Sequence, residues 1–183
     1  YSGNHSPCHP LDTLLDAAHV LRERSEIVFC FIGGGSEQIK VRQVAAELTN
    51  VKCLPYQPLN ELSSSLSAAD LHVVVMGDRF VGIVHPCKVY NIMSIGAPTL
   101  YIGPTPSHVT DIASQQQGRF FISTHGDVER VSAAIIDAMK LRERQPVISF
   151  AKHTLLPQLI DVIEAGQDFQ DVSRVIKMKP EIL

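Results

Sequence analysis

The sequence lacks several features that would place it in a special class. It has no tryptophan, and no apolar run approaches the roughly 20 residues of a membrane-spanning helix. No basic stripe emerges, and the net charge is -3 with a pI near 6.2, which argues against a general nucleic-acid binder. With 45% hydrophobic and 19% charged residues, the composition is that of an ordinary globular protein. We therefore expect a cytoplasmic globular protein that binds no nucleic acid.

Cysteine is scarce and carries no metal-binding pattern. The four cysteines (Cys8, Cys30, Cys53 and Cys87) have no CxxC spacing, and Cys30 and Cys53 fall in apolar segments. This pattern favours reduced cysteines that pack in the interior, with a disulfide or metal site as the alternative. No HExxH, no Ser-His-Asp order and no metal-spaced cluster occurs, so we predict no metal and assign no catalytic residue.

Short apolar segments alternate with segments of helical periodicity, and 183 residues suffice for one well-buried domain. This alternation predicts an α/β fold, namely a Rossmann-like open parallel sheet of about six strands with helices on both faces. The expected strands are the end of one at residues 1–2, then 27–32, 51–54, 71–76, 99–102 and 119–122. The expected helices cover 11–24, 36–48 capped by Ser36, 60–69 capped by Asn60, a helix after Pro86, 107–116 and 126–144.

The composition changes near residue 146. We predict a Rossmann-like domain over 1–145 and a helical tail over 146–183, which packs on this domain or on a missing amino-terminal half. Tyr1 and Ser2 are typical of the end of a strand whose apolar body lies outside the sequence. We therefore expect the chain to be a piece of a longer protein.

The segment between the apolar runs 71–76 and 99–102 is the most informative one. It contains Gly82, where a backbone can approach a ligand closely, and then Pro86 and Lys88 at the expected start of a helix. Free amides at a helix N-terminus, together with a lysine ammonium, favour phosphate binding. We expect this loop and helix to bind the diphosphate of a nucleotide-activated donor.

Pro86-Cys-Lys-Val-Tyr-Asn91 and Gly96-Ala-Pro98 resemble the donor-binding motif of retaining GT-B glycosyltransferases of the group 1, family 4-like type. One branch of that family has Pro-Ser-Lys-x-x-Glu followed by Ala-x-Gly-x-Pro. The resemblance extends over most of residues 1–145, through four further segments in the order of the family's carboxy-terminal domain. These are Tyr1-Ser-Gly-Asn4, Phe31-Ile-Gly-Gly-Gly35, Val51-Lys-Cys-Leu-Pro-Tyr56 and Ala68-Ala-Asp70.

The resemblance implies the donor-binding, carboxy-terminal half of a hexosyltransferase that acts in polysaccharide biosynthesis. Such an enzyme moves a sugar from a nucleoside diphosphate sugar to a glycan or lipid-linked acceptor, with retention at the anomeric carbon and without a cofactor. Its partners are the nucleotide-sugar donor and an amino-terminal acceptor domain, with peripheral association at the inner face of the membrane. The half alone is expected to be inactive, because catalysis needs both halves.

The resemblance also assigns donor-binding roles to residues of this chain. Lys88 contacts phosphate, and Asn91 stands where the family usually has a glutamate that holds ribose hydroxyls. Asn4 and His9 stand where many members have an arginine and a lysine, and the backbone near Tyr56 reads the base. The full set of candidates is Gly3, Asn4, His9, Gly33, Gly34, Tyr56, Gly82, Ile83, Lys88 and Asn91.

Other interpretations stay open. Gly33-Gly34-Gly35 is also explained by a tight turn that needs positive backbone angles. His85 and His108 follow predicted strands, on the side where open α/β sheets bind ligands. His72, inside a predicted strand, is expected to be structural. Two other functions share the fold: half of a sugar-nucleotide epimerase, and a non-catalytic interaction module, which Asn4, His9 and Asn91 would suit.

Overall fold

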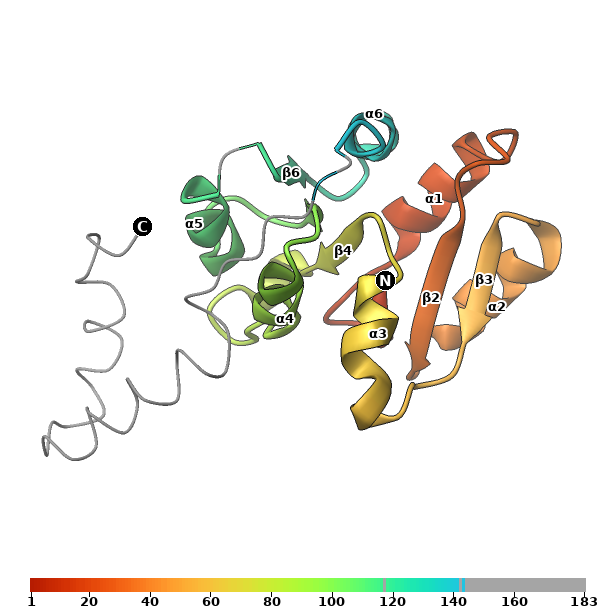
Figure 1. The fold of residues 1–183 in the computed structure, drawn as a ribbon, viewed down its shortest axis with the longest axis horizontal. Helices are drawn as coiled ribbons and strands as arrows, with labels where there is room; N and C mark the ends of the chain where they lie inside the picture. Colours follow the sequence, from red (N-terminus) through yellow and green to blue (C-terminus); the bar gives the residue numbers. More distant parts are fainter. Residues whose placement is uncertain (117, 142, 144–183) are drawn as a thin grey trace, which may run out of the picture. The chain divides into compact units, whose positions relative to one another are not determined.

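Strands and helices alternate along the chain in a computed structural model that describes residues 1–116, 118–141 and 143 (Figure 1). These residues belong to one unit, Tyr1–Pro146. The predicted helical tail over 146–183 lies outside the described residues. The strands are β1 (Ser2–Asn4), β2 (Phe29–Gly34), β3 (Val51–Leu54), β4 (His72–Val75), β5 (Thr99–Ile102) and β6 (Phe120–Ser123). The α-helices are α1 (Asp12–Val20), α2 (Gln38–Glu47), α3 (Leu62–Ser67), α4 (Lys88–Ile95), α5 (His108–Ser114) and α6 (Val128–Ala138).

All pairs of neighbouring strands are parallel, which confirms the predicted α/β class. The strands form two hydrogen-bonded sheets, β1-β2-β3 and β4-β5-β6, where we expected one sheet of six. The separation falls beside β1, which has three residues and pairs with the last residues of β2. The loop after β1, and not β1 itself, reaches the end of β4, where the Gly77 N–H donates to the Cys8 carbonyl at 2.9 Å.

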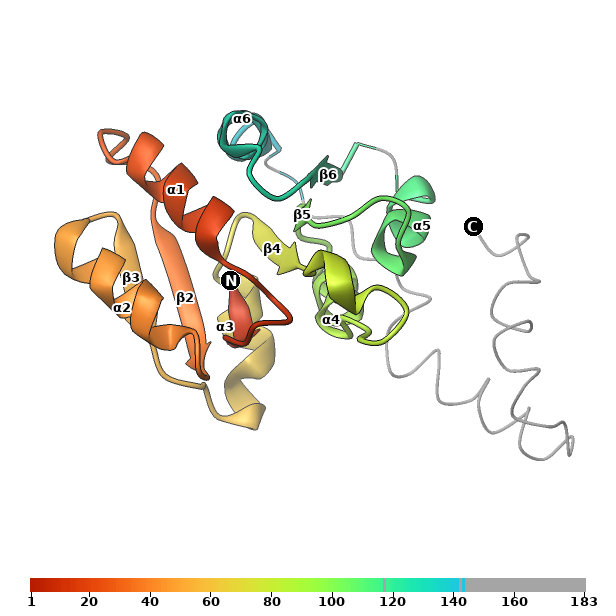
Figure 2. The ribbon, with the colours of Figure 1, turned by 180° about the vertical axis from the view of Figure 1, so that it is seen from behind.

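One hydrophobic core joins the two sheets. Buried side chains of β2, β4 and β5, among them Phe31, Val75 and Leu100, belong to a single cluster. Helix α1 packs on α6, which ties the first sheet to the second (Figure 2). The two sheets are therefore halves of one domain, as burial of apolar surface on both requires.

The predicted ends of the elements are right where the local signals are strong. Strands β3 and β5 match exactly, and Ser107 caps α5 as the first member of a capping box. The predicted caps Ser36 and Asn60 are wrong. Helix α2 begins after Glu37 without a side-chain cap, and Asn60 lies inside a 3₁₀ turn, Leu59–Glu61, that precedes α3.

The structural assignment of His72 is confirmed. Its imidazole is buried in β4, with Nε2 at 2.8 Å from the Leu66 carbonyl oxygen. The four cysteines are free, but Cys8, Cys30 and Cys53 are only half-buried and Cys87 is exposed, so the prediction that they pack in the interior is wrong. Among the helices that the structure describes, none has the length and apolarity needed to cross a membrane.

Candidate functional site

The carboxyl ends of β1 and β2 approach each other so closely that only glycine fits. Gly33 has a φ of +130°, and a Cβ there would overlap the Gly3 carbonyl oxygen. Gly35 has a φ of +139°, and a Cβ there would overlap the His5 carbonyl oxygen. The backbone explanation for this glycine segment is therefore correct at both positions. At these two positions the backbones of the first and second strands therefore meet without an intervening side chain.

Lys88, the first residue of α4, points toward β1. Its Nζ lies 3.8 Å from the centroid of the Tyr1 ring, a cation–π contact. A Cβ on Gly3 would lie 3.0 Å from the same Nζ, so Lys88 occupies the space that a side chain at residue 3 would need. Lys88 and the first strand are far apart in the sequence and come together only in the folded chain.

The Lys88 ammonium lacks an ionic partner among the described residues. Its Nζ is buried and makes no hydrogen bond to any residue that the structure describes. Burial lowers the pKa of Lys88 from 10.5 to about 8. A buried cation without an acceptor is costly unless an anion joins it. The arrangement therefore provides a place for an anionic group at the N-terminus of α4, which has no side-chain cap of its own.

Two histidines of the first loop lie near Lys88. His9 Nδ1 is 2.7 Å from the Val75 carbonyl oxygen, which fixes the ring at the end of β4. Desolvation and then the charge of Lys88 lower the pKa of His9, while the Val75 hydrogen bond opposes them. The His5 ring is fully buried against Tyr1, and desolvation is the largest cause of its lowered pKa. Both imidazoles favour the neutral form, so Lys88 supplies the positive charge here.

Tyr56 follows β3 and closes one side of a larger cleft. Its hydroxyl donates to the Gly34 carbonyl at 3.2 Å, and its exposed fraction is 59%. The cleft has a volume of about 400 Å³, in the range of small-molecule sites. Gly33 borders this cleft and also touches Gly3, so the cleft lies next to the Lys88 position. The lining residues are Gly33, Gln38, Arg42, Cys53, Leu54, Pro55 and Tyr56.

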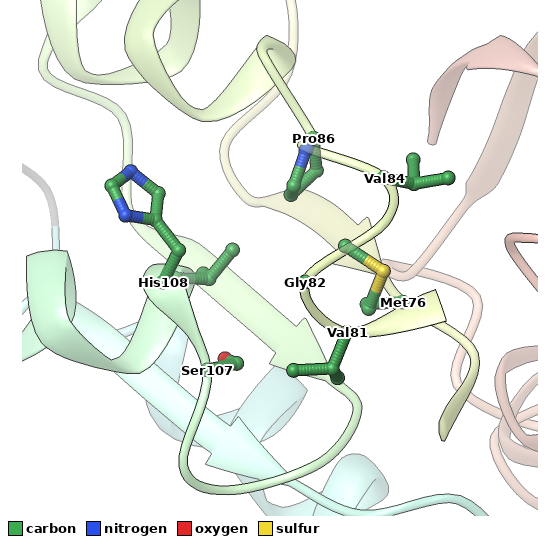
Figure 3. A pocket seen from close by; sticks show the side chains of 8 residues that line it. Met76, Val81, Gly82, Val84, Pro86, Ser107 and His108 are labelled. Carbon is green, nitrogen blue, oxygen red and sulfur yellow. The ribbon is translucent and has the colours of Figure 1, made fainter. Parts of the chain in front are cut away.

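Gly82 lies in the loop between β4 and α4 and borders a second, small cavity (Figure 3). Its φ is +79°, and a Cβ there would meet nothing within 4 Å. The cavity has a volume of about 20 Å³, enough for one water molecule, and His108 and Pro86 also line it. The next residue, Ile83, is 78% exposed. This loop presents backbone and an apolar side chain to solvent beside the start of α4.

The remaining candidates are the two asparagines. Asn91 is exposed on α4, one turn after Lys88. Asn4 is exposed at the end of β1, and its carbonyl oxygen accepts from the Tyr1 hydroxyl at 2.7 Å. Both amides are accessible to a ligand.

The structure thus brings Gly3, His9, Gly33 and Lys88 to one place, with Gly34 and Tyr56 at the adjoining cleft. Tyr1 is a contact of Lys88 that sequence reasoning missed. No pattern marks it, because it lies 87 positions away and acts through its ring face. No three His, Cys, Asp or Glu side chains lie together as a metal site in the part of the chain described.

Comparisons with known proteins identify the family of the chain. The family model for glycosyl transferases group 1 matches residues 1–153. The chain is 25% identical over 158 residues to WcaI, a glycosyl transferase assigned to colanic acid biosynthesis in Escherichia coli (strain K12). The match covers 85% of this chain and 39% of WcaI, so the chain spans about two fifths of that relative.

Solved structures share the fold. The catalytic domain of cholesterol-α-glucosyltransferase from Helicobacter pylori superposes with a TM-score of 0.65 at 19% identity, covering 85% of this chain and 94% of that chain. TarM superposes with a TM-score of 0.57 at 13% identity, covering 88% of this chain and 34% of that chain. These matches agree with a Rossmann-like half of the GT-B fold. With a family model that matches most of its length, the chain belongs to the glycosyl transferases group 1 family.

Proposed function

We propose that this chain is the carboxy-terminal, donor-binding half of a retaining glycosyltransferase that uses a nucleoside diphosphate sugar. The observation that carries the proposal is the buried Lys88 ammonium, which has no counter-ion among the described residues and lies at the N-terminus of α4. A diphosphate supplies the missing negative charge at this helix N-terminus.

Each part of the donor can then be assigned to one place on the domain. Its diphosphate lies on Lys88, its base lies in the cleft beside Tyr56, and its sugar lies against the loop that holds Gly82 and Ile83. The exposed amide of Asn91 is available for the ribose hydroxyls. During transfer the bond between the anomeric carbon and the diphosphate oxygen breaks, a bond to the acceptor hydroxyl oxygen forms, and the proton of that hydroxyl passes to the departing diphosphate. Lys88 stabilises the charge that develops on the departing diphosphate.

The acceptor is a glycan or a lipid-linked precursor, held by an amino-terminal domain outside this sequence. Peripheral membrane association of the whole enzyme follows from such an acceptor. Because acceptor contacts and part of the chemistry belong to that other domain, this chain alone binds nucleotide weakly and transfers no sugar. A measurable transfer rate from the isolated chain would contradict the proposal that transfer needs both domains.

A titration with UDP, GDP and ADP, followed through backbone amide signals by NMR, tests the donor site. One nucleotide is expected to move the signals of Gly33, Tyr56, Gly82 and Lys88, which would identify the base. Lys88→Met is the matched variant: it keeps the length of the side chain, removes the unpaired charge, and is expected to fold normally but abolish the shifts. A folded spectrum that ignores all three nucleotides would overturn the proposal in favour of a non-catalytic module.

A further inference from the structure

A second group of ionisable side chains lies where α4 meets α5. The Tyr90 hydroxyl is 2.8 Å from His108 Nε2 and 3.1 Å from His85 Nε2. The ring centroids of His85 and His108 are 4.2 Å apart. We call these two side chains the imidazole pair. Both histidines are exposed, and since Tyr90 holds both Nε2 atoms, Nδ1 is the nitrogen that each ring can offer to a ligand.

The two hydrogen bonds limit how protons can be distributed over Tyr90 and the two imidazoles. A phenol has one proton, so Tyr90 can donate to one Nε2 only and must accept from the other. Both imidazoles can then be neutral, with one Nε2 protonated. An additional proton on each ring would place two positive charges at van der Waals distance, which is unfavourable without an anion. Desolvation and the neighbouring His108 lower the pKa of His85, and no carboxylate contributes to that shift.

The imidazole pair is separate from the Lys88 site. Tyr90 follows Lys88 by two residues on α4, which corresponds to a rotation of about 200° around the helix axis. Lys88 accordingly faces Tyr1, and Tyr90 faces α5. His108 also lines the small cavity that Gly82 borders (Figure 3). Gly82 belongs to the loop against which the proposed function places the donor sugar.

We propose that His85, Tyr90 and His108 bind an oxyanion, a carboxylate or a phosphate, that the substrate carries in addition to its diphosphate. The inference rests on the proposed function and narrows its substrate class. The anion belongs either to the donor, as the carboxylate of a uronic acid, or to the acceptor, as the phosphate of a lipid-linked precursor. An oxyanion accepts charge-assisted hydrogen bonds from ring N–H groups, which makes it the kind of ligand that two adjacent imidazoles favour.

NMR of the imidazole Cε1–H signals in the 183-residue chain at pH 6.5 tests this site directly. Inorganic phosphate is expected to shift the signals of His85 and His108 but not that of His19, a partly exposed histidine on α1 that serves as the internal control. The double variant His85→Gln/His108→Gln keeps polar amides at both positions but cannot take up protons. His19→Gln is its matched control.

Paired ligands locate the source of the anion. UDP-glucuronate and UDP-glucose differ only at C6, and GDP-mannuronate and GDP-mannose form the equivalent pair for guanosine. If the donor carries the anion, the uronate of one pair binds the wild-type chain about tenfold tighter than its neutral partner, as expected for a charge-assisted hydrogen bond. The double variant then binds both equally. If the acceptor carries it, geranyl phosphate shifts the imidazole signals and the uronates show no preference.

The proposal is overturned if phosphate, both uronates and geranyl phosphate all leave the imidazole signals unmoved. It is also overturned if the double variant keeps the preference for a uronate. Failure of the donor site has a different signature, because amide shifts at Gly33, Tyr56 and Lys88 report nucleotide binding independently of the imidazole signals.

Discussion

Lys88 holds its charge in a place where water cannot compensate it. The unfolded side chain has the ordinary pKa of 10.5, and burial lowers the folded value to about 8. Between these two pH values the unfolded chain binds more protons than the folded chain. The free energy of unfolding of the ligand-free protein should therefore rise with pH in this window. A bound diphosphate reverses the preference, because it stabilises the ammonium.

Nucleotide affinity is accordingly expected to fall as the pH rises through 8. From pH 7 to pH 9 the dissociation constant for the preferred nucleoside diphosphate should increase about tenfold, since one proton must be restored to Lys88 on binding. Isothermal titration calorimetry at the two pH values measures it. Lys88→Arg keeps its charge throughout and should lose this pH dependence. An equal pH dependence in both proteins would show that another group titrates.

At Gly33 a side chain is excluded both by the positive φ and by the nearby backbone of β1. The energetic costs of these two effects can be measured separately. Gly33→Ala combines a φ of +130° with an overlap against Gly3, so we expect a loss of about 3 kcal/mol or more in the free energy of unfolding. Gly126→Ala has a φ of +83° with nothing within 4 Å and should cost about 1–2 kcal/mol. Urea denaturation of both variants makes the comparison. Equal losses would mean that the close approach of β1 and β2 relaxes freely.

Among the elements, α5 is short and depends on its first residue. The Ser107 hydroxyl accepts from the Thr110 N–H at 3.3 Å, and Thr110 Oγ1 accepts from the Ser107 N–H at 2.8 Å. Ser107→Ala is expected to cost about 1 kcal/mol of unfolding free energy, the usual value of an N-cap. It should also broaden the His108 imidazole signal, because His108 is the next residue.

The exposed Ser114 at the other end of α5 provides the control for this helix. Ser114→Ala removes a hydroxyl that donates to the Asp111 carbonyl but leaves the cap intact. We expect its unfolding free energy to stay within about 0.5 kcal/mol of the wild type. If the two serine variants were equally stable, the capping box would not be what holds α5 in place.

For the whole molecule, the question is whether two sheets unfold as one. The shared core and the packing of α1 on α6 predict a single cooperative transition for the described domain. Val131→Ala, at a fully buried position of α6, should lower the free energy of unfolding by about 2 kcal/mol. The loss should appear equally in hydrogen exchange of the Phe31 amide in β2 and the Leu100 amide in β5.

The matched control for this test is Val28→Ala, at a side chain that is 58% exposed, which should leave both amides unchanged. Loss of protection at Leu100 alone would mean that the second sheet opens independently. The two halves would then be separate folding units in spite of their common core.

The sequence by itself determined the alternation of strands and helices, because apolar periodicity is local. It placed β3 and β5 at their exact bounds and the start of α5 within one residue. It also predicted a phosphate site around Lys88, because a lysine next to the expected N-terminus of an apolar helix favours phosphate binding. The caps Ser36 and Asn60 were mispredicted, because a local preference does not reveal where packing starts a helix.

Only the tertiary structure decided what surrounds these residues. The contact of Lys88 with Tyr1 joins α4 to the first residue of the chain, and the contact of Tyr90 with His108 joins α4 to α5. The division into two three-stranded sheets likewise depends on which backbone groups face each other across β1. Such relations depend on how the chain folds back on itself. Burial, and with it the lowered pKa of Lys88, exists only once the surrounding elements have excluded water.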